Sequence, residues 1–219
     1  MRVSMQGSML SLALAAALAL TPAARAADPV PPDQVVKDTT DRLQKEISAH
    51  EKEFKTDSRK LYAFVDNVIV PKFDTRYIAQ LILARHWKSA SEAQRARFET
   101  AFKNMLVHSY ADALVQYHND VKAEWQPLRI APGATEVTVQ SKLIRASGKP
   151  PLPIGFAMRL KDNEWKVYDI VIENLSLVTS FRSQVNSEIK RSDLEAVIKK
   201  LEAGQTIEPA KTTDPAKTS

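Results

Sequence analysis

The sequence predicts an α+β fold in which N- and C-terminal helices cover a curved antiparallel β-sheet of about four strands, giving a cone-like domain with an apolar pocket. Three observations lead to this prediction. The first half of the chain carries apolar residues at helical spacing. From Val121 onward, alternating and β-branched runs are separated by Pro and Gly. At Leu175 and Ser176 a two-residue period changes back to a helical one, so helices also close the chain.

The N-terminal half is expected to hold four helices. Apolar residues recur at helical spacing over 36–54 and again over 61–69, where Pro71 ends the second pattern. Asp74 is placed to cap a third helix, because its side chain can accept a hydrogen bond from a free N–H of the first turn. A capping box then opens a long helical pattern over 91–117.

The strands are expected to form a meander, since they follow one another closely in the sequence. Alternation predicts strands over 137–143, 152–160 and 165–172, and 121–130 can add an edge strand. The dipeptide Asp162-Asn163 is a turn signal between the second and third of these. The third strand is predicted to place the following residues on one face: Trp165, Val167, Asp169 and Val171.

Two helices are expected to close the domain. A stripe from Leu177 to Ile189 follows the last strand, and Ser192 with Glu195 has capping-box spacing before a short final helix.

The two ends of the chain differ from the rest. Residues 1–26 are interpreted as a cleaved signal peptide, with a basic start, an apolar run over 9–20 and a small-x-small site at 24–26; an uncleaved anchor is the alternative. Residues 27–205 are expected to form one domain, and the Pro- and Thr-rich residues 206–219 a disordered tail. Cleavage after Ala26 would release an exported mature chain.

Composition excludes several functions. The chain has no Cys, so it has no disulfide and no thiolate metal site. Without Arg2 and Arg25, 29 basic residues remain against 26 acidic ones, an interspersed excess that does not indicate nucleic-acid binding. We expect a monomer.

Catalytic motifs are also lacking. Only five Gly occur and none builds a phosphate loop, while the four His show no metal-ligand spacing, so we expect neither metal nor cofactor and no enzyme. Asp169 interrupts an apolar strand face and leaves one alternative open, a ketosteroid-isomerase-like enzyme with this carboxylate as general base. The other interpretation is that Asp169 accepts hydrogen bonds from a neighbouring backbone or basic side chain.

The remaining positive feature is apolar surface on both the sheet and the helices. Periodicity alone does not separate a filled core from a pocket, so an interaction module with a packed core stays open as a further alternative. The candidate pocket-lining residues are Val65, Ile69, Phe73, Leu81, Phe102, Met105, Leu106, Val139, Ile154, Phe156, Met158, Val167, Val171, Leu177 and Phe181.

Three stretches together resemble the MlaC, or toluene-tolerance, family. They are FVDNVIVPKFDTRYIAQLILARHW from Phe64 to Trp87, ASEAQRARFETAFKNMLVHSY from Ala90 to Tyr110, and WKVYDIVIENLSLVTSFRSQ from Trp165 to Gln184. They occur in the expected order, and the resemblance covers nearly all of residues 35–205.

Two positions depart from the family pattern. Ala84 and Asn174 stand where Gly is expected. Ala costs little if its φ is negative, and Asn tolerates the left-handed region.

The resemblance implies a function. A member of this family would bind a glycerophospholipid by its acyl chains and carry it through the periplasm. Its partners would be the outer-membrane Mla lipoprotein complex and the inner-membrane Mla ABC transporter with its membrane-anchored substrate-binding ring. Such transport would maintain outer-membrane lipid asymmetry, with the phospholipid as cargo. A charge on the sheet wall, as in Val171→Glu, would then be expected to empty the pocket.

Overall fold

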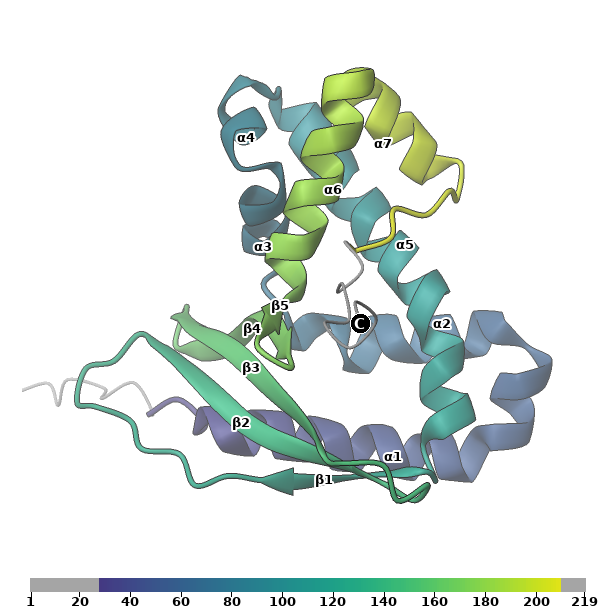
Figure 1. Cartoon of the computed structure of the whole chain (residues 1–219), viewed down its shortest axis with the longest axis vertical. Helices are drawn as coiled ribbons and strands as arrows, with labels where there is room; N and C mark the ends of the chain where they lie inside the picture. Colours follow the sequence, from purple (N-terminus) through teal and green to yellow (C-terminus); the bar gives the residue numbers. More distant parts are fainter. Residues whose placement is uncertain (1–27, 210–219) are drawn as a thin grey trace, which may run out of the picture.

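The computed structural model describes residues 28–209, so the predicted signal peptide (1–26) and residues 210–219 of the predicted tail lie outside the described residues. The first half of this range is helical, and the strands follow before two closing helices (Figure 1). The helices are α1 Pro32–Thr56, α2 Ser58–Val68, the 3-10 turn η1 Val70–Lys72, α3 Thr75–Leu83, α4 Arg85–Ser89, α5 Glu92–Tyr117, α6 Leu177–Arg191 and α7 Leu194–Glu202. The strands are β1 Val121–Trp125, β2 Glu136–Arg145, β3 Leu152–Lys161, β4 Glu164–Ile172 and β5 Leu175–Ser176.

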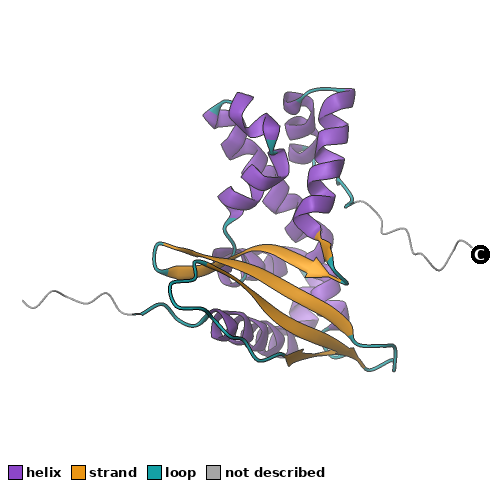
Figure 2. Ribbon diagram, turned by 60° about the vertical axis from the view of Figure 1, so that its left-hand side comes forward, coloured by secondary structure: helices purple, strands orange, loops and turns teal. Residues whose placement is uncertain are grey.

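The sheet is an antiparallel meander in the order β1-β2-β3-β4-β5. Asp162 and Asn163, with φ of 49° and 62°, form the predicted turn between β3 and β4, and both positive values suit the hairpin turn that matches strand twist. Figure 2 shows α1 and the lower helices behind one face of the sheet, with the remaining helices above it. The predicted α+β fold is therefore confirmed, with β5 as an additional two-residue strand.

The apolar core is divided into three clusters. The head core joins α3, α5, α6 and α7, the base core joins α1, α2 and α5, and the sheet core joins α1 to the sheet. Helix α5 belongs to two of them because its apolar residues lie on more than one face. Phe98, Phe102 and Met105 are buried in the head core, and Val107 and Val115 in the base core.

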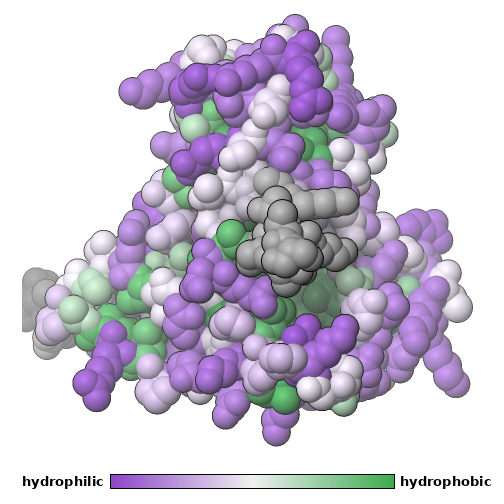
Figure 3. Space-filling view, viewed as in Figure 1, coloured by the Kyte–Doolittle hydropathy of each residue, from purple (hydrophilic) through white to green (hydrophobic). Residues whose placement is uncertain are grey.

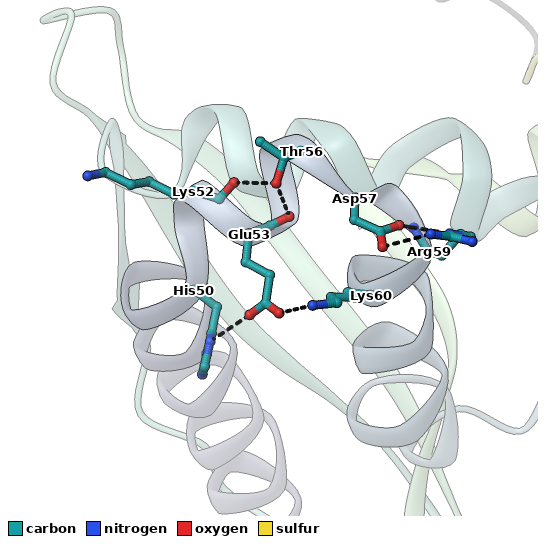
Figure 4. Close-up of polar contacts among 7 residues, drawn as sticks. All are labelled: His50, Lys52, Glu53, Thr56, Asp57, Arg59 and Lys60. Atoms are coloured by element: carbon teal, nitrogen blue, oxygen red, sulfur yellow. Dashed lines mark hydrogen bonds and ion pairs between the residues drawn. The ribbon is translucent and has the colours of Figure 1, made fainter.

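Polar contacts fix the joint between α1 and α2 (Figure 4). Asp57 caps α2 by accepting hydrogen bonds from the Arg59 backbone N at 3.2 Å and from its Nε at 2.9 Å. Glu53 of α1 contacts Lys60 of α2 and His50, whose Nδ1 lies 3.1 Å from Glu53 Oε2. The lysine contact holds the pKa of Glu53 below its usual range. Side chains of both helices thus stabilise the turn between them.

The C-terminal end differs from expectation in two details. Asp193, not Ser192, caps α7, because its carboxylate accepts a hydrogen bond from Ala196 N at 2.8 Å. Ile207, two residues past the predicted domain end, is 5% exposed and belongs to the head core. No helix within residues 28–209 combines the length and apolar character needed to cross a membrane.

Candidate functional site: an open apolar cleft

One face of the sheet carries apolar side chains in register across the three strands β3, β4 and β5, next to Ser141 of β2. Ser141 of β2 pairs with Ile154 of β3, Ile154 with Ile172 of β4, and Ile172 with Leu175 of β5. Directly paired residues share a face of an antiparallel sheet. We call Ile154, Ile172 and Leu175 the open row.

Helix α1 covers only one end of this face. Val36 of α1 is buried in the sheet core with Val139, Met158 and Val167, and Val139 and Met158 are fully buried. By contrast, the open row belongs to none of the three cores of the described chain: Ile154 and Ile172 are half-buried, and Leu175 is 42% exposed. The sheet therefore keeps an apolar region that its own helices do not fill.

A stripe on α5 is a second partly uncovered surface. Leu106, Tyr110, Ala113 and Tyr117 follow one another at intervals of three and four, so they share one side of the helix. Tyr110 and Tyr117 are 44% and 49% exposed, unusual for aromatic side chains among apolar neighbours. Figure 1 shows α5 across from the sheet, with α6 above and α2 beside it.

The space-filling view shows apolar atoms in this central region (Figure 3). The open row and the exposed tyrosines of the α5 stripe are apolar surfaces that the three cores of the described chain leave uncovered, and we call the region between them the cleft. Such a cleft suits the chains of an apolar ligand, because each methylene moved out of water contributes about 0.8 kcal/mol.

The face predicted for β4 is wrong because of a β-bulge. Met158 pairs with Val167 and Ala157 pairs with Asp169, which leaves Tyr168 as an extra residue in β4. An extra residue shifts the alternation, so residues on either side of it exchange faces. Val167 therefore faces α1 and the sheet core, while Asp169 and Val171 point to the other face.

The candidate lining residues are distributed over all three cores. The head core contains Leu81, Phe102, Met105, Leu106, Leu177 and Phe181. The base core contains Val65 and Ile69, and the sheet core contains Phe73, Val139, Phe156, Met158 and Val167. Only Ile154 and Val171 lie outside these clusters, and of the two only Ile154 is on the cleft side. Sequence reasoning missed Ile172, Leu175, Tyr110 and Tyr117, although alternation and helical spacing were compatible with each of them.

Asp169 and a second polar side chain, Arg182, have structural roles. Asp169 Oδ1 accepts a hydrogen bond from Val178 N at 3.0 Å, which satisfies a free N–H in the first turn of α6. This is the backbone contact that the sequence left open as an alternative to catalysis. Arg182 Nε donates to Leu81 O at 2.7 Å and so joins α6 to the end of α3.

Asp74 is the most buried carboxylate of the described chain, with a side chain 2% exposed. It caps α3 as predicted, accepting from Tyr77 N at 3.2 Å. It also accepts from Arg159 at 3.1 Å and from Lys161 at 3.1 Å, contacts that the sequence did not predict. These bonds join the start of α3 to the C-terminal end of β3 and stabilise the buried charge.

The two positions where the family pattern has Gly differ in their backbone conformation. Ala84 has φ 47° and ψ −114°, so the condition under which Ala costs little does not hold. Asn174 has φ 67°, within the left-handed region that Asn tolerates. Ala84 therefore introduces backbone strain between α3 and α4.

A second hollow lies away from the cleft. A groove of about 640 Å³ runs between α5, α7 and the segment after α7, and its lining includes Arg97, Asn104, His108 and Thr206. Within residues 28–209, no three His, Asp or Glu side chains come together in a way that could hold a metal ion.

The fold and the cleft define a class: a single α+β domain in which an antiparallel meander keeps part of its apolar face uncovered beneath helices. The sequence model of the MlaC protein family matches residues 37–203. The chain belongs to the MlaC family, as its motifs predicted.

Named relatives agree with this assignment. The intermembrane phospholipid transport system binding protein MlaC of Haemophilus influenzae is 25% identical over 173 residues, covering 78% of this chain and 80% of the relative. The toluene tolerance protein ttg2D of Pseudomonas putida is 26% identical over 174 residues, covering 76% and 78%. A phospholipid-binding protein from Ralstonia solanacearum, solved in complex with a phospholipid, has a TM-score of 0.72 and 27% identity, covering 80% of this chain and 97% of that protein.

Proposed function

We propose that this protein is a periplasmic carrier that binds one glycerophospholipid, with the acyl chains in the cleft and the head group toward water. The observation that carries the proposal is the open row, an apolar strip in register across the sheet that no core of the described chain covers. The phospholipid complex of the Ralstonia solanacearum relative supports the same class of ligand. The cargo takes the place of a cofactor, and no catalytic residue is required.

The energy of lipid transfer explains why a carrier is needed. Two acyl chains expose about 28 methylenes, so moving them through water costs about 20 kcal/mol at ~0.8 kcal/mol each. A cleft lined by apolar side chains lowers this barrier without covalent chemistry.

The carrier would exchange its lipid with two membrane partners. We propose that these are the outer-membrane Mla lipoprotein complex and the inner-membrane Mla ABC transporter with its substrate-binding ring, and that the exchange maintains outer-membrane lipid asymmetry. Residues 1–26 would direct export as a cleaved signal peptide, which accounts for the periplasmic location. The membership of the chain in the MlaC family supports these partners.

The experiment is detergent-free purification of the mature protein followed by native and denaturing mass spectrometry. We expect one phospholipid per chain in the native spectrum, released on denaturation, with its head group identified by mass. A ligand-free mass after gentle handling would contradict the carrier function and favour the packed module or an enzyme that uses Asp169.

A further inference from the structure

The chain continues after α7 as an ordered strap, residues 203–209, which begins where the match to the family model ends. Gly204 has φ 76° and closes α7: its N–H donates to Leu201 O at 2.9 Å, and Gln205 N donates to Lys200 O at 3.1 Å. This pair of bonds with a left-handed Gly is the Schellman end of a helix. It turns the chain back toward α5, as the yellow segment in Figure 1 shows.

One side chain anchors the strap. Ile207 is 5% exposed within the head core, and its backbone N lies 3.2 Å from the Met105 sulfur on α5. The other strap residues from 203 to 208 are exposed. A segment with one buried side chain and few hydrogen bonds can open locally while the rest of the domain stays folded.

The strap runs from the groove beside α7 toward the α5 stripe. Gly204 and Thr206 line the groove of about 640 Å³ beside α7. Glu208 then lies close enough to Tyr110 to act on it electrostatically: burial first, and then the Glu208 charge, raise the pKa of the Tyr110 hydroxyl. Together with the contact between Ile207 N and Met105 on α5, this indicates that the strap runs along α5 from the groove toward Tyr110 of the α5 stripe.

We infer that this strap controls access to the cleft: with Ile207 docked it narrows the mouth beside Tyr110, and with Ile207 released it lets a lipid pass. The inference rests on the proposed function, because it assumes that the cleft holds the lipid. Ile207 is the residue on which the two states depend, since it is the only strap residue from 203 to 208 that is buried.

The test compares Ile207→Ala with Gln205→Ala, a change at an exposed strap position. Each protein is loaded with a fluorescent phosphatidylethanolamine, and its release to acceptor vesicles is timed. We expect release to be at least about tenfold faster in Ile207→Ala, because truncating a buried Ile removes most of the docking energy, and unchanged in Gln205→Ala. An equal rate in a folded Ile207→Ala protein, checked by circular dichroism, would overturn the inference.

Hydrogen exchange on the unmodified protein gives an answer that does not depend on lipid. Amides from 203 to 208 should exchange by local opening, faster than those of α5 and α7. If they exchanged only with global unfolding, the strap would not be a separate opening element and the inference would fail. If the wild-type protein bound no phospholipid at all, the proposed carrier function would fail. Hydrogen exchange would still show whether the strap opens on its own, so the failure of the carrier function and the failure of the strap as an opening element can be told apart.

Discussion

Two neighbouring residues of β4 test the position of the cleft directly. Ile172 belongs to the open row, whereas Val171 pairs with Gly155 and points to the opposite face. Both are half-buried and adjacent in the same strand, so Ile172→Glu and Val171→Glu introduce the same charge at nearly the same place in the fold.

The expected effect on lipid affinity depends on the surroundings of each new carboxylate. Ile172→Glu removes an apolar contact worth about 1.5–3 kcal/mol and places a charge against acyl chains, where poor solvation adds about 1–3 kcal/mol. The sum of about 2.5–6 kcal/mol corresponds to lipid binding that is weaker by about seventyfold to about twenty-thousandfold. Val171→Glu keeps the cleft unchanged, so its lipid affinity should stay within about threefold of wild type, which is under 1 kcal/mol.

The assay is lipid occupancy by native mass spectrometry, supported by titration of delipidated protein with a fluorescent phospholipid. Urea unfolding of both variants controls for damage to the strand. Full occupancy in a folded Ile172→Glu protein, or equal losses in the two variants, would refute the placement of the cleft on this face.

Three further predictions concern stability, each measured by urea unfolding. Ala84→Gly should stabilise the protein by about 0.5–2 kcal/mol, because it relieves backbone strain of about 1–3 kcal/mol at a small entropic cost. The control, Ala63→Gly within α2, should destabilise the protein by about 0.5–1 kcal/mol. A loss of stability in Ala84→Gly would contradict the backbone geometry at this position. Asp74→Ala should lower the free energy of unfolding by about 2–4 kcal/mol, which is less than the full cost of breaking a buried ion pair because the two basic partners of Asp74 are partly exposed. A loss under about 1 kcal/mol would argue against Asp74 as the residue that joins α3 to β3. Arg97 holds the pKa values of its two glutamate partners on α7 below their ordinary 4.5, so the stability that these ion pairs add is present above that pH and is lost as pH falls through the lowered pKa values. Arg97→Met should therefore remove this part of the acid sensitivity of the free energy of unfolding. If the variant and the wild type showed the same dependence of stability on pH, this role of Arg97 would be wrong.

Local signals in the sequence predicted most of the fold. Ser91 and Gln94 form the expected capping box, with both hydrogen bonds present at 3.1 and 3.2 Å. Asp74 caps α3, and the turn at 162–163 joins β3 to β4. Each of these features depends on residues within a few positions of one another, so spacing and residue type were sufficient.

The cleft depended on information that spacing does not contain. The bulge at Tyr168 is defined by the pairing of β4 with β3, and a strict two-residue period could not show it. Likewise, Val139 and Ile154 share one apolar face, yet only Val139 lies beneath α1. Where a helix crosses a sheet is set by tertiary packing, so the sequence identified the apolar face without separating its filled part from its open part.

The division of the apolar interior into three cores has a consequence for how this protein can change. The side chains that hold the helices and sheet together are largely distinct from the open row and the exposed tyrosines of α5. Substitutions along the cleft can therefore change the binding surface at little cost to folding, because other side chains determine the stability of the scaffold. In this fold the residues that shape the cleft and the residues that hold the domain together can thus vary separately.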